Sequence, residues 1–252
     1  MADPADRLAR SFGFEEIDPA TKAGRVRGVF DRVAARYDLM NDLMSLGVHR
    51  LWKDALVDWL APRPGIVHAD LGGGTGDVAV RIRARTAGGA DVAVIDVNEA
   101  MLRVGRDRAL DTNRFTGLFW IAGDAMALPL ADRSIDSASM AFAMRNVTHV
   151  DRALAEIRRV LKPGGRFLCL EFSKVTLPVL DAIYDRYSFT VLPALGRTVA
   201  GDAASYRYLA ESIRRFPDQE GFAQLMRSAG FEQVRWRNLS AGIACIHSGW
   251  RL

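Results

Sequence analysis

The sequence predicts an α/β fold: a mostly parallel, seven-stranded sheet covered by helices on both faces and ending in an antiparallel hairpin. Three observations predict it. Apolar, strand-length runs alternate with amphipathic helical segments between residues 66 and 172. Four glycines, Gly72, Gly73, Gly74 and Gly76, directly follow the first of these runs. Two apolar runs near the end of the chain are joined by only two residues, which is too short for a parallel crossover.

Residues 1–62 are expected to form an N-terminal helical segment that serves as a lid or substrate region. Apolar residues recur at three- and four-residue steps from Val26 to Met44, which is the period of an amphipathic helix. A second helix is expected over residues 51–60, where the stretch "APRPG" ends it.

Residues 63–252 are expected to form the core, with a helical insertion at 174–216. Asn98 is placed at the start of the second core helix, where its side chain can cap the helix. A "PGG" turn at 163–165 is expected to precede the fifth strand. The expected strands are 66–71, 91–97, 115–123, 134–144, 166–172, 231–239 and 242–250, and the expected core helices are 75–86, 98–110 and 151–162.

The composition favours a soluble, metal-free protein of the cytoplasm. The chain has 252 residues, of which 49% are hydrophobic, and its net charge of +4 is evenly spread, which argues against a nucleic-acid partner. Cys169 and Cys245 lie in apolar, strand-like stretches that suit buried free thiols. The histidines are far apart, so no metal site is expected. The sequence shows neither a signal-peptide core nor a membrane-spanning run.

The glycine turn is expected to bind a nucleoside-containing ligand. In open α/β sheets, ligands bind at the carboxyl ends of the strands, and residues 74–79 match the loose G-x-G-x-x-A dinucleotide pattern. A tight strand-to-helix connection without a ligand is the alternative for the glycines alone. Asp96 ends the second strand, where it could accept both ribose hydroxyls. Asp124 and Ala125 follow the third strand, where they could contact an adenine.

Acidic residues on both sides of the turn suggest the charge of this ligand. Asp70 and Asp77 would repel a pyrophosphate but suit an ammonium or a sulfonium group. The expected ligand is therefore a cationic nucleoside. Any one of these acids taken alone also fits a helix cap or a solvated strand end.

The arrangement resembles the class I S-adenosylmethionine-dependent methyltransferases, which have a Rossmann-like fold. The stretches "YDLMNDLMSLGVHRLW" at 37–52, "RVLKPGGRFLCLEFS" at 159–173, "RNVT" at 145–148 and "DAASYRYLAESI" at 202–213 are similar to segments of the UbiE/COQ5/MenG family. The likeness extends from about residue 29 to the C-terminus. It implies methyl transfer from S-adenosyl-L-methionine to a ring carbon of a polyprenylated benzoquinol or demethylmenaquinol, in ubiquinone or menaquinone biosynthesis.

The resemblance places cofactor contacts at Thr75, Asp96, Asp124 and Ala125. Ala141 stands where relatives carry a small hydroxyl residue, so one hydrogen bond is missing here. The full set of expected cofactor-binding residues is Asp70, Gly72, Gly74, Thr75, Gly76, Asp96, Val97, Asp124 and Ala125.

Arg145 and Asn146 are expected to be catalytic because they follow the fourth strand at the same edge. A ring carbon becomes nucleophilic when a neighbouring hydroxyl ionises, so Arg145 is assigned to stabilising the phenolate and Asn146 to orienting the quinol oxygen. The alternative for Arg145 is an ion pair with Asp136 or Asp151 at a strand end.

Two further catalytic candidates come from the N-terminal helices. Tyr37 continues the apolar stripe, so core packing is its alternative role. His49 titrates near neutrality and could act as a base, although a helix-cap role fits it equally. Glu171 ends the fifth strand, where it could satisfy backbone donors around the site.

The polyprenyl tail suggests contact with the inner face of a membrane. Residues 187–201 offer apolar surface, with Arg186, Arg197 and Arg207 nearby to meet anionic headgroups. Core packing or a subunit interface is the alternative, and a homodimer or a complex of quinone-biosynthesis proteins is left open. Two rival functions also stay open: an NAD-linked oxidoreductase, and a scaffold that binds the cofactor without turnover.

Overall fold

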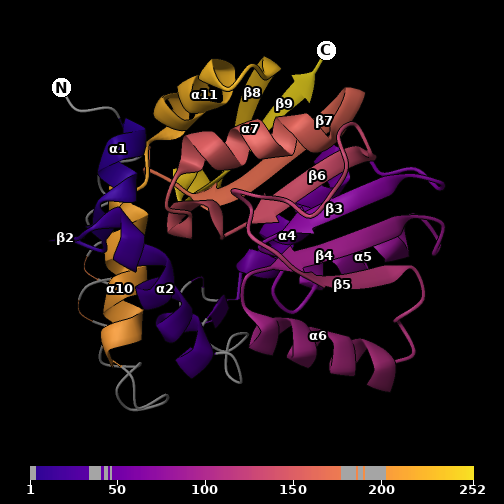
Figure 1. Cartoon of the computed structure of the whole chain (residues 1–252), viewed down its shortest axis with the longest axis horizontal. Helices are drawn as coiled ribbons and strands as arrows, with labels where there is room; N and C mark the ends of the chain where they lie inside the picture. Colours follow the sequence, from indigo (N-terminus) through magenta and orange to yellow (C-terminus); the bar gives the residue numbers. More distant parts are fainter. Residues whose placement is uncertain are drawn as a thin grey trace.

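The computed structural model describes residues 4–33, 41–42, 45, 47–176, 186, 190 and 203–252. Figure 1 shows a central sheet between two layers of helices, with the N-terminal elements at one side. The elements before the sheet are α1 (Pro4–Ala9), β1 (Ser11–Phe12), β2 (Glu15–Glu16), α2 (Pro19–Val33) and α4 (His49–Leu60). The sheet region contains β3 (Val67–Leu71), α5 (Asp77–Arg85), β4 (Asp91–Asp96), α6 (Glu99–Asp111), β5 (Leu118–Ala122), β6 (Ile135–Ala141), η2 (Met144–Asn146), α7 (Val150–Val160), β7 (Leu161–Phe172), α10 (Ala203–Arg215), α11 (Gln219–Ser228), β8 (Glu232–Leu239), η5 (Ser240–Gly242) and β9 (Ala244–Arg251).

The seven-stranded sheet confirms the predicted fold class. Its strand order is β5-β4-β3-β6-β7-β9-β8. The first five strands pair in parallel, β9 pairs antiparallel with β7, and β8 pairs antiparallel with β9. The chain moves outward from β3 to β5 and then returns to place β6 on the other side of β3. The ends of β3 and β6 therefore form the switch point where open α/β sheets bind ligands.

Both faces of the sheet are buried, as expected for a parallel sheet. Alternate residues of β4 face opposite sides: Val92 and Val94 join the core cluster that contains α4, α5 and α6, whereas Ala93 and Ile95 join the cluster that contains α7 and α11. In Figure 1, α7 and α11 lie in front of the sheet, and α4 and α5 lie behind it. The apolar runs seen in the sequence are therefore strands covered on both sides.

The structure confirms a turn at the predicted "PGG" segment, but the turn interrupts a strand. Strand β7 begins at Leu161, directly after α7, so residues 163–165 lie within the bounds of this strand. The pairing of β7 with β6 passes from Ile135↔Leu161 to Ser137↔Arg166, so residues 162–165 stand opposite one residue of β6, and Gly164 adopts a positive φ of 79°. Proline and glycine predicted the turn from local preference, and the pairing of Leu161 with β6 extends the strand to the residue before it.

The N-terminal region holds more structure than the sequence predicted. Helix α1 and the β1–β2 hairpin lie in a stretch for which no element was expected. Helix α2 covers the first part of the predicted amphipathic stretch, and α4 ends at Leu60, close to the predicted end. Cys169 and Cys245 are buried and free. In the part of the chain that the structure describes, no helix is both long and apolar enough to cross a membrane.

Candidate functional site

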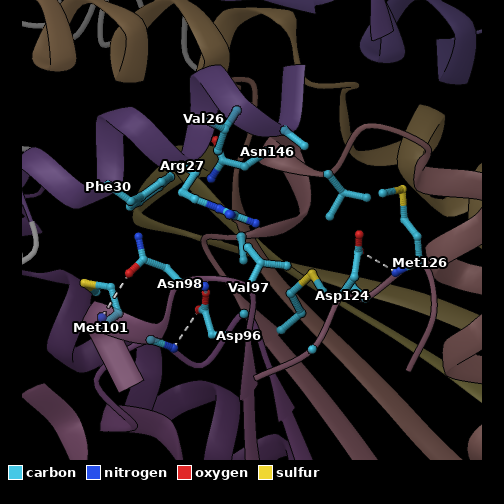
Figure 2. A pocket seen from close by; sticks show the side chains of 18 of the residues that line it. Val26, Arg27, Phe30, Asp96, Val97, Asn98, Met101, Asp124, Met126 and Asn146 are labelled. Atoms are coloured by element: carbon cyan, nitrogen blue, oxygen red, sulfur yellow. Dashed lines mark hydrogen bonds between the residues drawn. The ribbon is translucent and has the colours of Figure 1, made fainter. Parts of the chain in front are cut away.

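A pocket opens at the carboxyl ends of the parallel strands, beneath helix α2 (Figure 2). One face of α2 supplies residues at three- and four-residue spacing, and the strand ends supply the rest. The lining residues include Ala23, Val26, Arg27 and Phe30 from α2, and Gly72, Gly74, Asp96, Val97, Asn98, Met101, Asp124, Ala125, Met126, Phe142, Ala143, Asn146 and Val147 from the sheet side. The pocket brings together residues that follow β3, β4, β5 and β6, as the fold predicted.

Two of the four glycines of the turn line the pocket. These are Gly72 and Gly74, which have positive φ angles of 57° and 52°. Three of the four make room for the protein itself: a Cβ on Gly72 would clash with Ala143, one on Gly73 would lie 2.8 Å from Val94 and one on Gly76 would lie 2.5 Å from Trp120. Neither Gly76 nor the buried Thr75 lines the pocket. The close approach that the glycine cluster suggested is therefore largely an approach of the protein's own side chains.

Asp96 at the end of β4 faces the pocket with its carboxylate held in place. One carboxylate oxygen accepts the backbone N–H of Gly74 at 2.9 Å, and the other accepts that of Asn98 at 2.8 Å. Burial raises the pKa of Asp96, and the backbone N–H groups oppose this shift. Each carboxylate oxygen can accept more than one hydrogen bond, so this arrangement can still receive a pair of ribose hydroxyls.

Asp124 and Ala125 lie on the turn after β5, across the pocket from α2 (Figure 2). The Asp124 carboxylate accepts the backbone N–H of Met126 at 2.8 Å, which fixes its direction. Val97 lines the floor between Asp96 and this turn and is 46% exposed, so its apolar side chain is available to a flat ring. Ala141, where the resemblance indicated a missing hydrogen bond, does not line the pocket.

Asp70 lies beneath the glycine turn and not in the pocket lining. It is 1% exposed and accepts a hydrogen bond from the Ser139 hydroxyl at 2.9 Å. Ser139 in turn contacts His68 Nε2 at 2.9 Å, and His68 Nδ1 contacts Ser137 at 2.8 Å. Burial raises the pKa of Asp70 to about 7 and lowers that of His68 to about 3.

Asp77, the first residue of α5, is neutralised by two cations. Its carboxylate lies 2.8 Å from Lys53 Nζ and 3.2 Å from Arg81 Nε. Burial acts to raise the pKa of Asp77, but the attraction of Lys53 and Arg81 outweighs it and leaves the pKa below its usual value. The argument that Asp70 and Asp77 select a cationic ligand is therefore weaker than the sequence suggested, because one is buried and the other is paired.

Arg145 is buried in an ion pair that the sequence did not predict. Its guanidinium lies 2.5 Å from the Glu171 carboxylate and also donates to the backbone carbonyl of Phe142. The two side chains are 3% and 1% exposed, and Arg145 does not line the pocket. The alternative for Arg145, an ion pair at a strand end, is thus closer to the observed geometry than a contact with a ligand. The partner is Glu171, however, and not Asp136 or Asp151. Asp136 pairs with Lys162 instead.

Glu171 has the role that was expected for it. Its carboxylate accepts the backbone N–H groups of Arg145 and Phe172, both at 3.1 Å. The carboxylate therefore fixes the start of the segment after β6, which carries Asn146 into the pocket.

Asn146 lines the pocket and is held from behind by Tyr208 of α10. The Tyr208 hydroxyl donates to Asn146 Oδ1 at 2.9 Å, and the Tyr208 ring stacks on Phe12. Because its oxygen is engaged, Asn146 presents its amide N–H groups as donors to a ligand oxygen. Of the catalytic candidates that are described, Asn146 is the one that reaches the pocket.

His49 lies at the start of α4 and away from the pocket lining. Its Nε2 contacts Asp42 at 3.0 Å, and its backbone N–H bonds to the Ser45 hydroxyl. Burial lowers the pKa of His49. The N-cap of α4 is Val48, whose side chain makes no cap hydrogen bond, so His49 does not have the helix-cap role, and its role as a base stays a prediction. Tyr37 lies outside the described residues, as do residues 187–189 and 191–201 of the expected membrane-contact stretch.

Sequence reasoning expected a lid from residues 1–62 but did not name the residues of α2 that form the pocket wall. Arg27 of this helix extends into the pocket, and Val26 and Phe30 lie beside it on the same wall (Figure 2). The stripe of Val26, Val29 and Phe30 was a signal for a buried helix face, but nothing local showed which side chains face a ligand. Among the described residues, no cluster of His, Cys, Asp or Glu could hold a metal ion.

Comparison with known proteins identifies the family. The family model described as the ubiE/COQ5 methyltransferase family matches residues 19–251. A Paracoccus denitrificans protein named ubiquinone/menaquinone biosynthesis C-methyltransferase UbiE is 58% identical over 249 residues, which is 99% of both chains. A protein of the same name from Brucella abortus is 53% identical over 247 residues, covering 97% of this chain and 92% of the relative.

Solved structures agree on the fold. A Thermotoga maritima protein described as an S-adenosylmethionine-dependent methyltransferase and possible histamine N-methyltransferase superposes with a TM-score of 0.64. The alignment covers 90% of this chain and 100% of that chain at 22% sequence identity. At this identity the similarity supports the Rossmann-like methyltransferase fold and says nothing about the substrate.

Proposed function

The chain belongs to the ubiE/COQ5 methyltransferase family, and from this premise we propose that it methylates a ring carbon of a polyprenylated benzoquinol or of demethylmenaquinol, in ubiquinone or menaquinone biosynthesis. It is an S-adenosylmethionine-dependent methyltransferase by family and by fold. The observation that carries the proposal is the pocket beneath α2, where Asp96 and Asp124 stand at successive strand ends within a largely apolar lining.

The pocket residues fit the cofactor by their chemistry. Asp96 is assigned to the ribose hydroxyls, and Val97 and Ala125 to the faces of the adenine, with Asp124 at its amino group. Gly72 and Gly74 border the cavity with their backbones alone. When bound, S-adenosyl-L-methionine supplies an electrophilic methyl group. Asp70, Thr75 and Gly76 do not line the pocket, so we assign them to supporting the conformation of the glycine turn and not to contact with the cofactor.

Two polar groups of this chain face the space where a quinol ring would lie. Asn146 presents amide donors, and Arg27 brings a guanidinium from α2 into the pocket (Figure 2). We assign Asn146 to orienting the quinol oxygen. Arg27, an exposed residue, is assigned to stabilising the negative charge that develops on this oxygen as its proton leaves to water, and its attraction for this charge strengthens as bound substrate displaces solvent.

Arg145 receives a positioning role in this proposal. Its ion pair with Glu171 holds the segment that carries Asn146, and its guanidinium bonds to the backbone of Phe142 without itself lining the pocket. The sequence-based assignment of Arg145 to the phenolate stays a prediction, as does the assignment of His49 and Tyr37 to catalysis.

The proposed substrate also implies a place of action. A polyprenyl tail resides in a bilayer, so we propose a cytoplasmic protein that contacts the inner membrane surface reversibly. Arg207 on α10 is a described residue of the expected basic set. A homodimer or a complex with other quinone-biosynthesis proteins stays a prediction that light scattering of the purified protein can test.

A methyl-transfer assay tests the function. Purified protein is incubated with isotope-labelled S-adenosylmethionine and with short-tailed benzoquinol or demethylmenaquinol, and the products are analysed by mass spectrometry. We expect a labelled methyl group on a ring carbon, with activity lost in Asp96→Ala and retained in Asp107→Ala, which removes an exposed carboxylate from α6. Label on neither quinol, together with thermal stabilisation by NAD alone, would favour the oxidoreductase. Cofactor binding without any turnover would favour the scaffold.

A further inference from the structure

A second pocket lies where α1, the end of α10 and the beginning of α11 meet. Its lining includes Arg7, Lys174, Arg214, Arg215 and Asp218, and it shares no residue with the pocket beneath α2. Figure 1 shows α1 beside α10 at the same side of the molecule as α11. Segments that are far apart in the sequence therefore bring four cationic side chains to one concave site.

The charge of this pocket contrasts with the pattern elsewhere on the surface. Arg25 pairs with Glu15, Arg103 with Glu99, and Arg159 with Glu156. In the second pocket, Arg214 already has a partner, whereas Arg7, Lys174 and Arg215 have no close carboxylate among the described residues, and Asp218 is the acidic residue of the lining. The site thus carries an excess of positive charge that a bound anion could balance.

The Asp218 carboxylate already bonds to the backbone of the protein. As the N-cap of α11, its carboxylate accepts the backbone N–H of Gly221 at 2.9 Å. Its other oxygen lies 3.9 Å from Lys174 Nζ, which is too long for a close ion pair. Asp218 and Glu220 at the start of α11 offset the positive end of this helix, so the excess positive charge comes from the basic side chains of the lining.

The cations differ in how firmly they are held. Arg215 donates to the backbone carbonyl of Phe14 at 3.1 Å, and its guanidinium lies 5.7 Å from the centre of the Phe14 ring. Arg7 and Lys174 are exposed, and Lys174 follows β7 by two residues. Arg215 therefore forms a fixed part of the wall, while Arg7 and Lys174 can move to meet a ligand.

We propose that this pocket binds a phosphate group, with the headgroup of an anionic lipid as its source. Guanidinium groups bind phosphate oxygens in bidentate fashion, and an ammonium group adds a compact charge. The phosphate site is inferred from the basic lining alone. The choice of a lipid as its source rests on the proposed function, since a polyprenylated substrate brings the protein to a bilayer. The pocket lies near the end of β7, on the strand-end side of the sheet where the other pocket opens.

Vesicle binding by the full-length protein provides the test. Vesicles of phosphatidylcholine, with or without phosphatidylglycerol, are sedimented with the wild type, with Arg7→Gln/Lys174→Gln, and with the control Arg103→Gln/Arg106→Gln. Both double variants remove two exposed positive charges, and the control does so on α6. Each basic residue at an anionic surface contributes roughly fivefold, so we expect the pocket variant to bind about 25-fold more weakly and the control much less so.

A second arm identifies the source of the phosphate. Inorganic phosphate is titrated against the same three proteins by calorimetry. Phosphate binding that is lost in the pocket variant, without vesicle binding by the wild type, supports the site and assigns it to a soluble ligand. Equal losses in the pocket variant and the control, or no binding of either probe to the wild type, overturn the proposal. Methyl transfer to a short-tailed quinol should be unchanged in the pocket variant, so failure of the proposed function is seen separately.

Discussion

The buried pair of Arg145 and Glu171 shows how a residue can be important near a site without touching a ligand. The carboxylate of Glu171 holds both the guanidinium and the backbone N–H of Arg145. A buried charge that loses its partner is costly, whereas replacing both charges by apolar groups can be nearly neutral. The effect of Arg145 on the free energy of unfolding can therefore be measured separately from its effect on methyl transfer.

Arg145→Ala alone is expected to lower the free energy of unfolding by about 3–5 kcal/mol, because Glu171 is left buried and unpaired. Arg145→Met/Glu171→Gln should recover part of this loss, because it removes both charges while the amide oxygen can still accept a backbone N–H of the segment. Urea unfolding measures both. If the stable double variant keeps a near-normal kcat, the arginine is not needed in the chemical step. A stable double variant whose kcat falls more than a thousandfold with an unchanged KM would contradict the positioning role.

Arg27 is the arginine that the account places against the reacting quinol. We expect Arg27→Gln to lower kcat by roughly 10–100-fold and to shift the rise of the pH–rate profile to higher pH, because the phenol is then harder to ionise. Arg25→Gln, on the same helix but paired with Glu15, is the matched control. Equal activity of the two variants would remove Arg27 from the mechanism.

The buried Asp70 carboxylate makes the stability of the protein depend on pH in a specific way. The chain from Ser137 through His68 and Ser139 supplies a donor to Asp70. A neutral His68 donates from Nε2 to Ser139 and accepts at Nδ1 from Ser137, so each donor in the chain points toward Asp70. Even so, burial keeps the pKa of Asp70 near 7.

The sign of the resulting effect follows from proton uptake. The native pKa of Asp70, about 7, lies above the ordinary value of 3.8, so the native state binds more protons at this group between these pH values. The contribution of Asp70 to the free energy of unfolding therefore falls as the pH rises from about 4 to 7. Asp70→Asn should therefore gain stability relative to wild type between pH 4 and pH 8, by at most about 4 kcal/mol. Urea unfolding at both pH values tests this, with Asp91→Asn as an exposed control. A pH-independent difference would contradict it.

Helix α2 is the element that closes the cofactor pocket, and it is tied down at both ends. The Asn98 side chain caps α6 through the Met101 N–H and donates to Asp31 of α2 at 2.8 Å. At the other end, the buried Lys22 donates to the backbone carbonyls of Leu8 and Val147. Burial lowers the pKa of Lys22 to about 8. These contacts couple the helix to the loops that line the pocket.

Loss of the Asp31 contact should loosen α2 over the pocket. We expect Asp31→Ala to weaken S-adenosylhomocysteine binding by roughly 2–10-fold, in line with about 1 kcal/mol for one hydrogen bond. Calorimetry measures the affinity, and Asp107→Ala on the exposed side of α6 is the control. Unchanged affinity in Asp31→Ala would show that α2 does not contribute to cofactor binding through this contact.

The elements differ in how far local sequence determined them. Parallel strands were predictable because their apolar runs are buried on both faces, and Asn98 was predictable as a cap because its side chain bonds to its own helix. The position of the "PGG" segment within β7 depended on pairing with β6, which no local pattern contains. The same limit applies to side chains: Asp96 and Asp124 followed from strand ends. In contrast, the Lys53 partner of Asp77 and the Glu171 partner of Arg145 lie 24 and 26 residues away in the sequence.

For the whole molecule, binding of the cofactor product should stabilise the native state. A ligand at 100 times its Kd adds about 2.7 kcal/mol, which corresponds to roughly 5–10 °C in Tm for a chain of this size. We expect S-adenosylhomocysteine to give such a shift and NAD to give none, as measured by differential scanning fluorimetry. Asp96→Ala should abolish the shift. A shift with NAD alone would point to the oxidoreductase function.

A crystal structure with S-adenosylhomocysteine tests the central claim most directly, because the account depends on where the nucleoside lies. The account predicts electron density beneath α2, with both ribose hydroxyls on the Asp96 carboxylate and the adenine between Val97 and Ala125. Density for the nucleoside in another pocket, or an Asp96 carboxylate turned away from the ribose, would contradict it.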